Sequence, residues 1–206
     1  MAPPAGDDVR GRLLASATEL FARKGYAATT VREIVEAAGV TKPVLYYYFG
    51  NKEGLYLELM TAPHGRFLSL LEEAGEGGAG AAGKIRALSL RYHETFRRHR
   101  DVARIGYGVY FGPPQGAPFV DFDDYQLRMM ERVGALVREG IATGEFRDGD
   151  AEAMTLAILA VQNMTNQIEL CRVEMRLGAE GLERMLGVLL DGMRPKETGK
   201  GKRDRK

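Results

Sequence analysis

The feature that most constrains this chain is a pair of short helical segments joined by a tight glycine turn within its first 52 residues. Thr30 and Glu33 fit a capping box, in which the Thr30 hydroxyl accepts from the Glu33 amide and the Glu33 carboxylate accepts from the Thr30 amide. The helix that they start ends at Gly39, because a left-handed glycine lets the chain turn sharply. Thr41 can cap the next helix, in which Pro43 is tolerated because a first-turn N–H has no helical partner. Two helices joined in this way cross at a steep angle, which is the geometry of a helix-turn-helix unit.

The remainder of the chain also has helical periodicity. Apolar residues recur at spacings of three and four, and the sequence has no alternating run typical of a strand. Gly25 is expected to end the first helix, and Pro63 to kink or break the fourth near Leu59, as a hinge or as a fixed bend. A glycine-rich stretch, 75–83, is expected to be a loop. The predicted helices cover about 9–24, 31–38, 42–49, 52–73, 84–99, 101–111, 120–143, 150–177 and 179–193. The sequence therefore predicts an all-α fold with an N-terminal three-helix helix-turn-helix head and a larger C-terminal helical domain.

The helix predicted over 42–49 has two unlike faces. At about 100° per residue, Leu45, Tyr48 and Phe49 share one side and should face the core. The opposite side is rich in apolar and tyrosine side chains, which suits the major groove of DNA, because apolar groups contact thymine methyls while hydroxyls and lysines reach phosphates. Helix N-termini suit phosphate oxygens as well. The candidate DNA-binding residues are Thr30, Thr41, Lys42, Pro43, Val44, Tyr46, Tyr47 and Lys52, although the tyrosines could also be plain surface aromatics and Lys52 a solvated charge.

Several spaced motifs within about residues 10–55 carry a family resemblance. They are Leu20-Phe21-Ala-Arg-Lys-Gly25-Tyr26, Thr29-Thr30-Val-Arg-Glu-Ile34, Ala38-Gly39-Val40 and Leu45-Tyr46-Tyr47-Tyr48-Phe49-Gly-Asn-Lys52. Together they resemble the TetR family of tetracycline-repressor-like regulators. The resemblance implies an all-helical homodimer whose head binds a palindromic operator in double-stranded DNA, and whose C-terminal domain binds a small molecule that releases the DNA. Two departures are Val35, where the family more often has alanine, and Pro43-Val44, which replaces a commoner small or hydroxylated pair and favours an apolar contact.

The charge distribution supports this division of the chain. The 206 residues hold 29 Lys+Arg and 28 Asp+Glu, for a formal net charge of +1. That average hides a net +2 over residues 1–52, −6 over 53–192 and +5 over 193–206. The predicted regions are a flexible N-terminus (1–8), a DNA-binding domain (9–52), a ligand-binding and dimerisation domain (53–193) and a basic tail (194–206). The tail is expected to be disordered, either simply solvated or adding salt-sensitive affinity for DNA.

The helix predicted over 150–177 supplies the clue to an effector site. It is apolar on nearly all sides up to Val161 and then presents a cluster of amides. Mid-helix amides in an apolar domain need partners, which could be a ligand or water in a cavity, or one another and the backbone. With neighbouring aromatic and methionine side chains they predict a pocket for a small apolar or amphipathic effector. The candidate ligand-binding residues are Tyr92, Tyr107, Tyr110, Phe111, Met129, Gln162, Asn163, Asn166 and Gln167.

The last two helices are candidates for the dimer contact. A helix that is apolar on every side needs partners on several faces, and the resemblance supplies symmetry mates in a four-helix interface. The alternative is an intramolecular core. The candidate interface residues are Leu182, Met185, Leu186 and Leu189, which recur at helical spacing.

Other chemistry has little support in the sequence. The three histidines lack an i, i+4 partner or a zinc-protease frame, and no nucleophile elbow, P-loop or dinucleotide fingerprint occurs. We expect no enzyme activity, catalytic residue, metal or cofactor. The single cysteine, Cys171, fits a reducing, cytoplasmic location. No stretch of about 18 uninterrupted apolar residues occurs, and we expect no signal peptide, because the first eight residues lack its basic and apolar regions. Open alternatives are a TetR-like structural DNA-binding protein controlled by a protein partner, or a helical ligand carrier or enzyme without a DNA role. Repressor and activator are not distinguished by the sequence.

Overall fold

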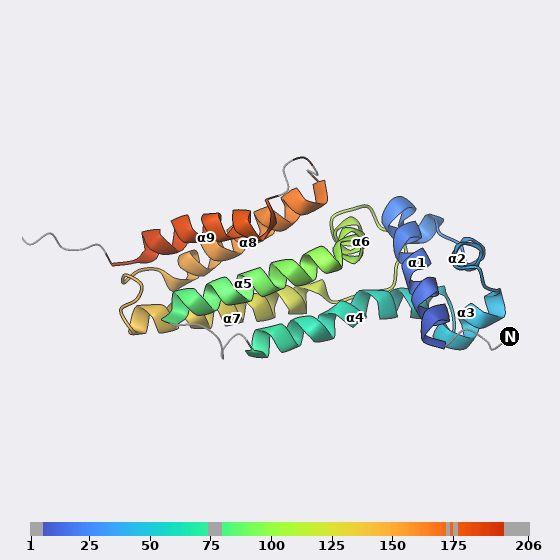
Figure 1. The fold of residues 1–206 in the computed structure, drawn as a ribbon, viewed down its shortest axis with the longest axis horizontal. Coiled ribbons are helices and arrows are strands. Elements are labelled where there is room, and N and C mark those ends of the chain that lie inside the picture. The colour runs from blue at the N-terminus through green and yellow to red at the C-terminus, as the bar shows by residue number, and fades with distance from the viewer. Residues whose placement is uncertain (1–5, 74–79, 172–173, 175–176, 196–206) are drawn as a thin grey trace, which may run out of the picture. The chain divides into compact units, whose positions relative to one another are not determined.

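The computed structural model describes residues 6–73, 80–171, 174 and 177–195. No strand occurs among these residues, so the prediction of an all-α fold is confirmed (Figure 1). Most of the predicted flexible N-terminus, basic tail and glycine-rich loop lies outside the described residues. The helices of the described part are α1 (Gly6–Ala28), α2 (Val31–Ala38), α3 (Lys42–Phe49), α4 (Lys52–Glu73), α5 (Gly80–Arg98), α6 (Arg100–Tyr110), α7 (Phe122–Ala142), α8 (Ala151–Cys171) and α9 (Gly178–Met193).

Glycine and proline account for most differences from the predicted bounds. α1 is continued past Gly25, but the glycine itself is not helical, with φ 82° and ψ 168°, so the first helix stops there as predicted and a short helical segment follows it. α4 runs past Pro63 as one assigned helix, so the chain is not broken there. α5 begins at Gly80, so the last residues of the expected glycine-rich loop form its first turn. α8 ends at Cys171, before the predicted end at residue 177.

The described helices group into two compact units. Unit 1 contains the described residues up to Leu70 together with Glu94–Gln126, and unit 2 contains Leu71–His93 together with the described residues from Leu127 onward. Unit 1 therefore includes α6 and the segment 111–121 in addition to the helix-turn-helix, and α6 packs against α1. Residues distant in sequence thus help to support the first three helices.

The core of unit 1 forms because each helix turns one apolar face inward. The rings of Phe21, Tyr26 and Tyr56 pack together with centroids 4.9–5.7 Å apart. Burial of each large apolar side chain stabilises the fold by about 1.5–3 kcal/mol. The other buried members of this core are Leu13, Ala17, Leu20, Ile34, Val35, Ala38, Leu45, Phe49, Leu55, Leu59, Met60 and Ile105.

Unit 2 has buried apolar side chains of its own, and hydrogen bonds from Glu145 fix the start of α5. The Glu145 carboxylate accepts from the Ala81 amide at 2.6 Å and the Ala82 amide at 3.0 Å, which satisfies first-turn N–H groups of α5. The Lys84 ammonium lies 2.6 Å from the carboxylate of Glu139 in α7. Its most buried apolar side chains include Ile85, Leu88, Val133, Leu136, Val137, Phe146, Ile158, Leu182, Leu186 and Leu190. None of the described helices combines the length and apolar character needed to cross a membrane.

Candidate nucleic-acid interface and effector site

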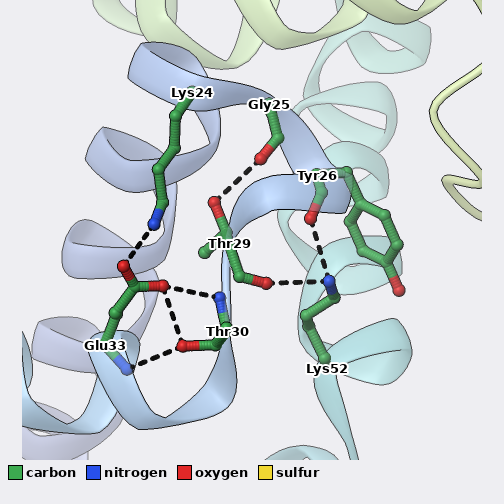
Figure 2. Close-up of polar contacts among 7 residues, drawn as sticks. All are labelled: Lys24, Gly25, Tyr26, Thr29, Thr30, Glu33 and Lys52. Carbon is green, nitrogen blue, oxygen red and sulfur yellow. Dashed lines mark hydrogen bonds and ion pairs between the residues drawn. The ribbon is translucent and has the colours of Figure 1, made fainter.

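The N-terminus of α2 is fixed by a polar network. The Glu33 amide donates to the Thr30 hydroxyl at 3.3 Å, and the Thr30 amide donates to the Glu33 carboxylate at 2.9 Å, so the predicted capping box is confirmed (Figure 2). The other carboxylate oxygen of Glu33 pairs with the Lys24 ammonium from α1. The hydrogen bond from Lys24, followed by those from Thr30, lowers the pKa of Glu33 to about 2. Glu33 is therefore ionised at neutral pH, and it joins the start of α2 to α1.

The turn between α2 and α3 has the predicted backbone. Gly39 has φ 65° and ψ 39°, in the left-handed region, and a Cβ there would meet nothing within 4 Å. The need for glycine is therefore conformational. Thr41 occupies the N-cap of α3 but its side chain makes no capping hydrogen bond, and Pro43 lies in the first turn. The predicted position of Thr41 is correct, whereas the hydroxyl does not cap the helix.

α3 presents the two faces that the sequence predicts. Leu45 and Phe49 are buried, and Tyr48 is half-buried against the same core. On the opposite side Tyr47 is 83% exposed and Tyr46 is 47% exposed. Lys42 and Pro43 are exposed as well, whereas Val44 is half-buried against the core, so this valine is less available than expected. One face of α3 is therefore anchored in the core, and the opposite face is free for a partner.

Lys52 lies in a different setting from the one expected. Its ammonium donates to the carbonyl oxygens of Tyr26 and Thr29, both at 2.8 Å, and lies 4.0 Å from the centroid of the Tyr26 ring (Figure 2). Burial lowers the pKa of this lysine. Lys52 thus ties the start of α4 to the α1–α2 turn, which no sequence signal indicates. Its predicted contact with a DNA phosphate remains a prediction.

Buried polar side chains gather on α5 and α8 in unit 2. The Gln162 amide donates to the Asn166 carbonyl oxygen at 3.4 Å, and the Asn166 amide donates to the Tyr92 hydroxyl at 3.3 Å. These three residues, all at most 9% exposed, are called the amide cluster below. Oε1 of Gln162 is buried and has no hydrogen-bond partner among the described residues. The other buried polar side chains on these two helices are Ser89, His93, Thr155, Thr165 and Glu169.

The structure separates the remaining predicted effector residues. Asn163 and Gln167 are exposed, so they do not join the buried amide cluster, and their contact with an effector stays a prediction. Residues 162, 166 and 169 share one helix face at about 3.6 residues per turn, and the two exposed amides fall beside it. Met129 is buried in unit 2. In unit 1, Tyr107 is half-buried, and Tyr110 and Phe111 are exposed.

The candidate dimer residues on α9 also divide. Leu182 and Leu186 are fully buried within one chain, so they pack in the core of unit 2, which is the alternative to a dimer contact that the sequence leaves open. A side chain already removed from water by its own chain gains no burial from a partner. Met185 and Leu189 are half-buried. α8 and α9 pack side by side (Figure 1). Their exposed large apolar side chains are Leu156, Met164 and Val188.

Comparison with known proteins now identifies the class of the chain. Residues 13–59, which span the helix-turn-helix and the start of α4, match the sequence profile of bacterial regulatory proteins of the tetR family. The transcriptional regulator AcuR of Cereibacter sphaeroides is 31% identical over 153 residues, which cover 70% of this chain and 68% of AcuR. The chain belongs to the TetR family of transcriptional regulators.

Other relatives match over shorter or more divergent stretches. The HTH-type transcriptional activator FasR of Mycolicibacterium smegmatis is 48% identical over 54 residues, which cover 26% of this chain and 25% of the activator. The matched curated relatives include proteins named as activators and proteins named as repressors. The solved TetR family regulator PfmR of Thermus thermophilus has a TM-score of 0.71 at 25% identity, covering 89% of this chain and all of that one. The match to the family profile covers residues 13–59, whereas the fold is shared along most of the chain.

Proposed function

We propose that the chain is a dimeric, ligand-responsive transcriptional repressor that binds a palindromic operator through α3. The observation that carries the proposal is the exposed face of α3, where Tyr46 and Tyr47 project from a helix anchored by buried Leu45 and Phe49. Pro43 offers an apolar contact to the groove floor, and Lys42 a charge for a phosphate. The Thr41 hydroxyl makes no capping bond, which suits a phosphate contact at this helix N-terminus.

Thr30 has a more limited role in this proposal. Its amide and hydroxyl both donate to the Glu33 carboxylate, at 2.9 and 2.8 Å. A phosphate approaching the N-terminus of α2 therefore meets a carboxylate already bonded there. We infer that the remaining first-turn amides of α2, rather than the Thr30 side chain, face the DNA backbone.

The homodimer is proposed to form through exposed surfaces of α8 and α9. Leu156 and Met164 of α8 and Val188 of α9 are 49%, 53% and 79% exposed in the single chain. An isologous contact between two copies would cover these side chains. A dimer also provides two recognition helices, which a palindrome requires in major grooves about 34–36 Å apart.

The effector is proposed to be an amphipathic small molecule that binds at the amide cluster in unit 2. An unsatisfied buried acceptor such as Oε1 of Gln162 costs about 1–3 kcal/mol, and a donor on an incoming molecule would remove that cost. A purely apolar effector would leave it in place. The effector therefore carries a hydroxyl or N–H group on an apolar body, and it releases the operator by binding one conformation of the dimer more tightly.

Selection of DNA from a random pool, followed by fluorescence anisotropy on the selected sequence, tests the proposal. We expect a palindrome that binds the wild-type dimer, and a loss of at least about 100-fold in affinity in Tyr46→Ala/Tyr47→Ala, since two base-reading or phosphate contacts are removed. Phe119→Ala is the matched control, because Phe119 is an exposed aromatic (85%) away from α3. Unchanged binding by the double variant would overturn α3 as the reading helix.

A further inference from the structure

Gln115 joins two parts of unit 1 that are far apart in sequence. It lies in the segment 111–121 between α6 and α7, and its Oε1 accepts from the Tyr26 amide at 3.1 Å. Its own amide donates to the Gly108 carbonyl oxygen at 3.4 Å, near the end of α6. The side chain is half-buried. Gln115 thus bridges the end of α6 and the interrupted end of α1.

Gly25 shows that the backbone of α1 makes room for this side chain. A Cβ on Gly25 would lie 2.3 Å from Oε1 of Gln115, far inside a van der Waals contact. The glycine also has φ 82°, a conformation that side-chain-bearing residues rarely adopt. Because of this interruption, the Tyr26 amide bonds to a side chain from another segment. Position 25 therefore requires glycine for its φ, and a side chain there would also displace the Gln115 amide from its bond to Tyr26.

Tyr26 is held from its other side as well. Its carbonyl oxygen accepts from the Lys52 ammonium at 2.8 Å, and the same ammonium donates to the Thr29 carbonyl oxygen (Figure 2). The Thr29 hydroxyl donates to the Gly25 carbonyl oxygen at 2.8 Å. The next residue is Thr30, the N-cap of α2. Gln115 and Lys52 together therefore fix the short peptide that sets where α2 begins.

We propose that Gln115 is a positioning residue for DNA binding, which holds the α1–α2 turn in the geometry that presents α2 and α3 to the operator. The inference rests on the proposed DNA-binding function.

The test compares three full-length variants with the wild-type chain. Gln115→Leu removes the acceptor at similar size, Gln115→Glu retains an acceptor for the Tyr26 amide, and Gln126→Leu is the matched control on an exposed glutamine of the same unit. Each is measured for affinity to the selected operator, for unfolding in urea, and for hydrogen exchange at the Tyr26 amide. For Gln115→Leu we expect operator affinity to fall about tenfold and Tyr26 exchange to accelerate about tenfold, as for loss of one hydrogen bond. Gln115→Glu should restore slow exchange, and Gln126→Leu should match the wild type.

The possible outcomes separate the inference from the proposed function. If folded Gln115→Leu binds the operator with wild-type affinity, the positioning role is wrong, even where its unfolding free energy is lower. Exchange at Tyr26 that is unchanged in Gln115→Leu would contradict the role in the same way. If the wild-type chain itself selects no DNA, the proposed function fails, and the inference fails with it. The positioning role is supported if Gln115→Leu binds the operator more weakly while its stability stays near normal and Gln126→Leu binds normally. Slow exchange of the Tyr26 amide in Gln115→Glu would complete that support.

Discussion

The α1–α2 turn of unit 1 and the amide cluster of unit 2 differ in how completely their polar groups are hydrogen-bonded. At the turn, the Glu33 carboxylate binds both Lys24 and Thr30, and the Lys52 ammonium binds two carbonyl oxygens at 2.8 Å. In the amide cluster the hydrogen bonds are 3.3 and 3.4 Å long, and Oε1 of Gln162 has no partner in the described part of the chain. The first network is well satisfied, and the second is incomplete.

This difference fits the proposed combination of a fixed DNA-binding surface in unit 1 and an effector site in unit 2. A satisfied network holds one backbone geometry, which suits a helix that must fit the DNA groove. A buried group without a partner can instead favour the conformation in which a bound molecule satisfies it. We therefore expect substitutions at the turn to lower stability, whereas loss of the unpartnered group in unit 2 should not.

The largest expected effect on stability is at Leu45, which anchors α3 in the core of unit 1. Leu45→Ala should lower the free energy of unfolding by about 2–5 kcal/mol, because Leu45 is fully buried and its truncation leaves a cavity. Tyr47→Ala on the same helix should change stability by less than about 0.5 kcal/mol, because that side chain is exposed. Urea unfolding measures both. Similar losses in the two variants would contradict the assignment of the faces of α3.

The next effect tests Lys52 as a tie between α4 and the turn. Lys52→Met keeps most of the side chain but removes two charge-assisted hydrogen bonds to backbone oxygens, and should destabilise unit 1 by about 1.5–3 kcal/mol. Lys42→Met is the control, since Lys42 is exposed on α3 and should fall within about 0.5 kcal/mol of the wild type. Operator binding gives a second readout, in which Lys42→Met should weaken affinity through a lost phosphate contact. Equal stability of the two variants would show that the hydrogen bonds of Lys52 do not stabilise the turn.

Smaller effects on stability are expected within the amide cluster, where Asn166→Leu and Gln162→Leu should act in opposite directions. Asn166→Leu removes a residue bonded to both Gln162 and Tyr92, and should cost about 1–2 kcal/mol. Gln162→Leu removes one long hydrogen bond together with the unpartnered acceptor, so stability should stay level or rise by up to about 1 kcal/mol. Thermal unfolding compares the two. A larger loss in Gln162→Leu than in Asn166→Leu would show that Gln162 is an ordinary, satisfied core residue.

The same contrast explains what the sequence can predict. The capping box of Thr30 and Glu33, the left-handed Gly39 and the faces of α3 depend on neighbours within a few residues, so local patterns suffice to predict them. The bond between Gln115 and Tyr26 joins residues 89 positions apart, and no periodicity marks either partner. Such contacts are set by the packing of whole helices.

The predictions for α8 and α9 are limited by the same lack of long-range information in the sequence. Asn163 and Gln167 are in the predicted amide run, but the helix turns them away from the buried face that holds Gln162 and Asn166. Leu182 and Leu186 have helical spacing that fits an interface or a core equally well, and only the packing of unit 2 assigns them to the core. Spacing predicts that a face is apolar but does not identify what covers it.

The smallest expected effect is the pH response of the cap on α2. The pKa of Glu33 is lowered to about 2, first by Lys24 and then by Thr30, whereas glutamate in an unfolded chain titrates near about 4.3. The stabilisation is therefore complete above the unfolded value and is lost as the pH falls from about 4.3 toward the folded value. Accordingly, the difference in unfolding free energy between the wild type and Glu33→Gln should be largest at neutral pH and shrink in acid. An NMR titration of the Glu33 carboxyl should give a midpoint near about 2 that rises in Lys24→Met. A midpoint near the unfolded value in both chains would contradict the network. With the expected midpoint, Glu33 stays ionised between pH 7 and 5, so a change in operator binding over that range must come from other groups.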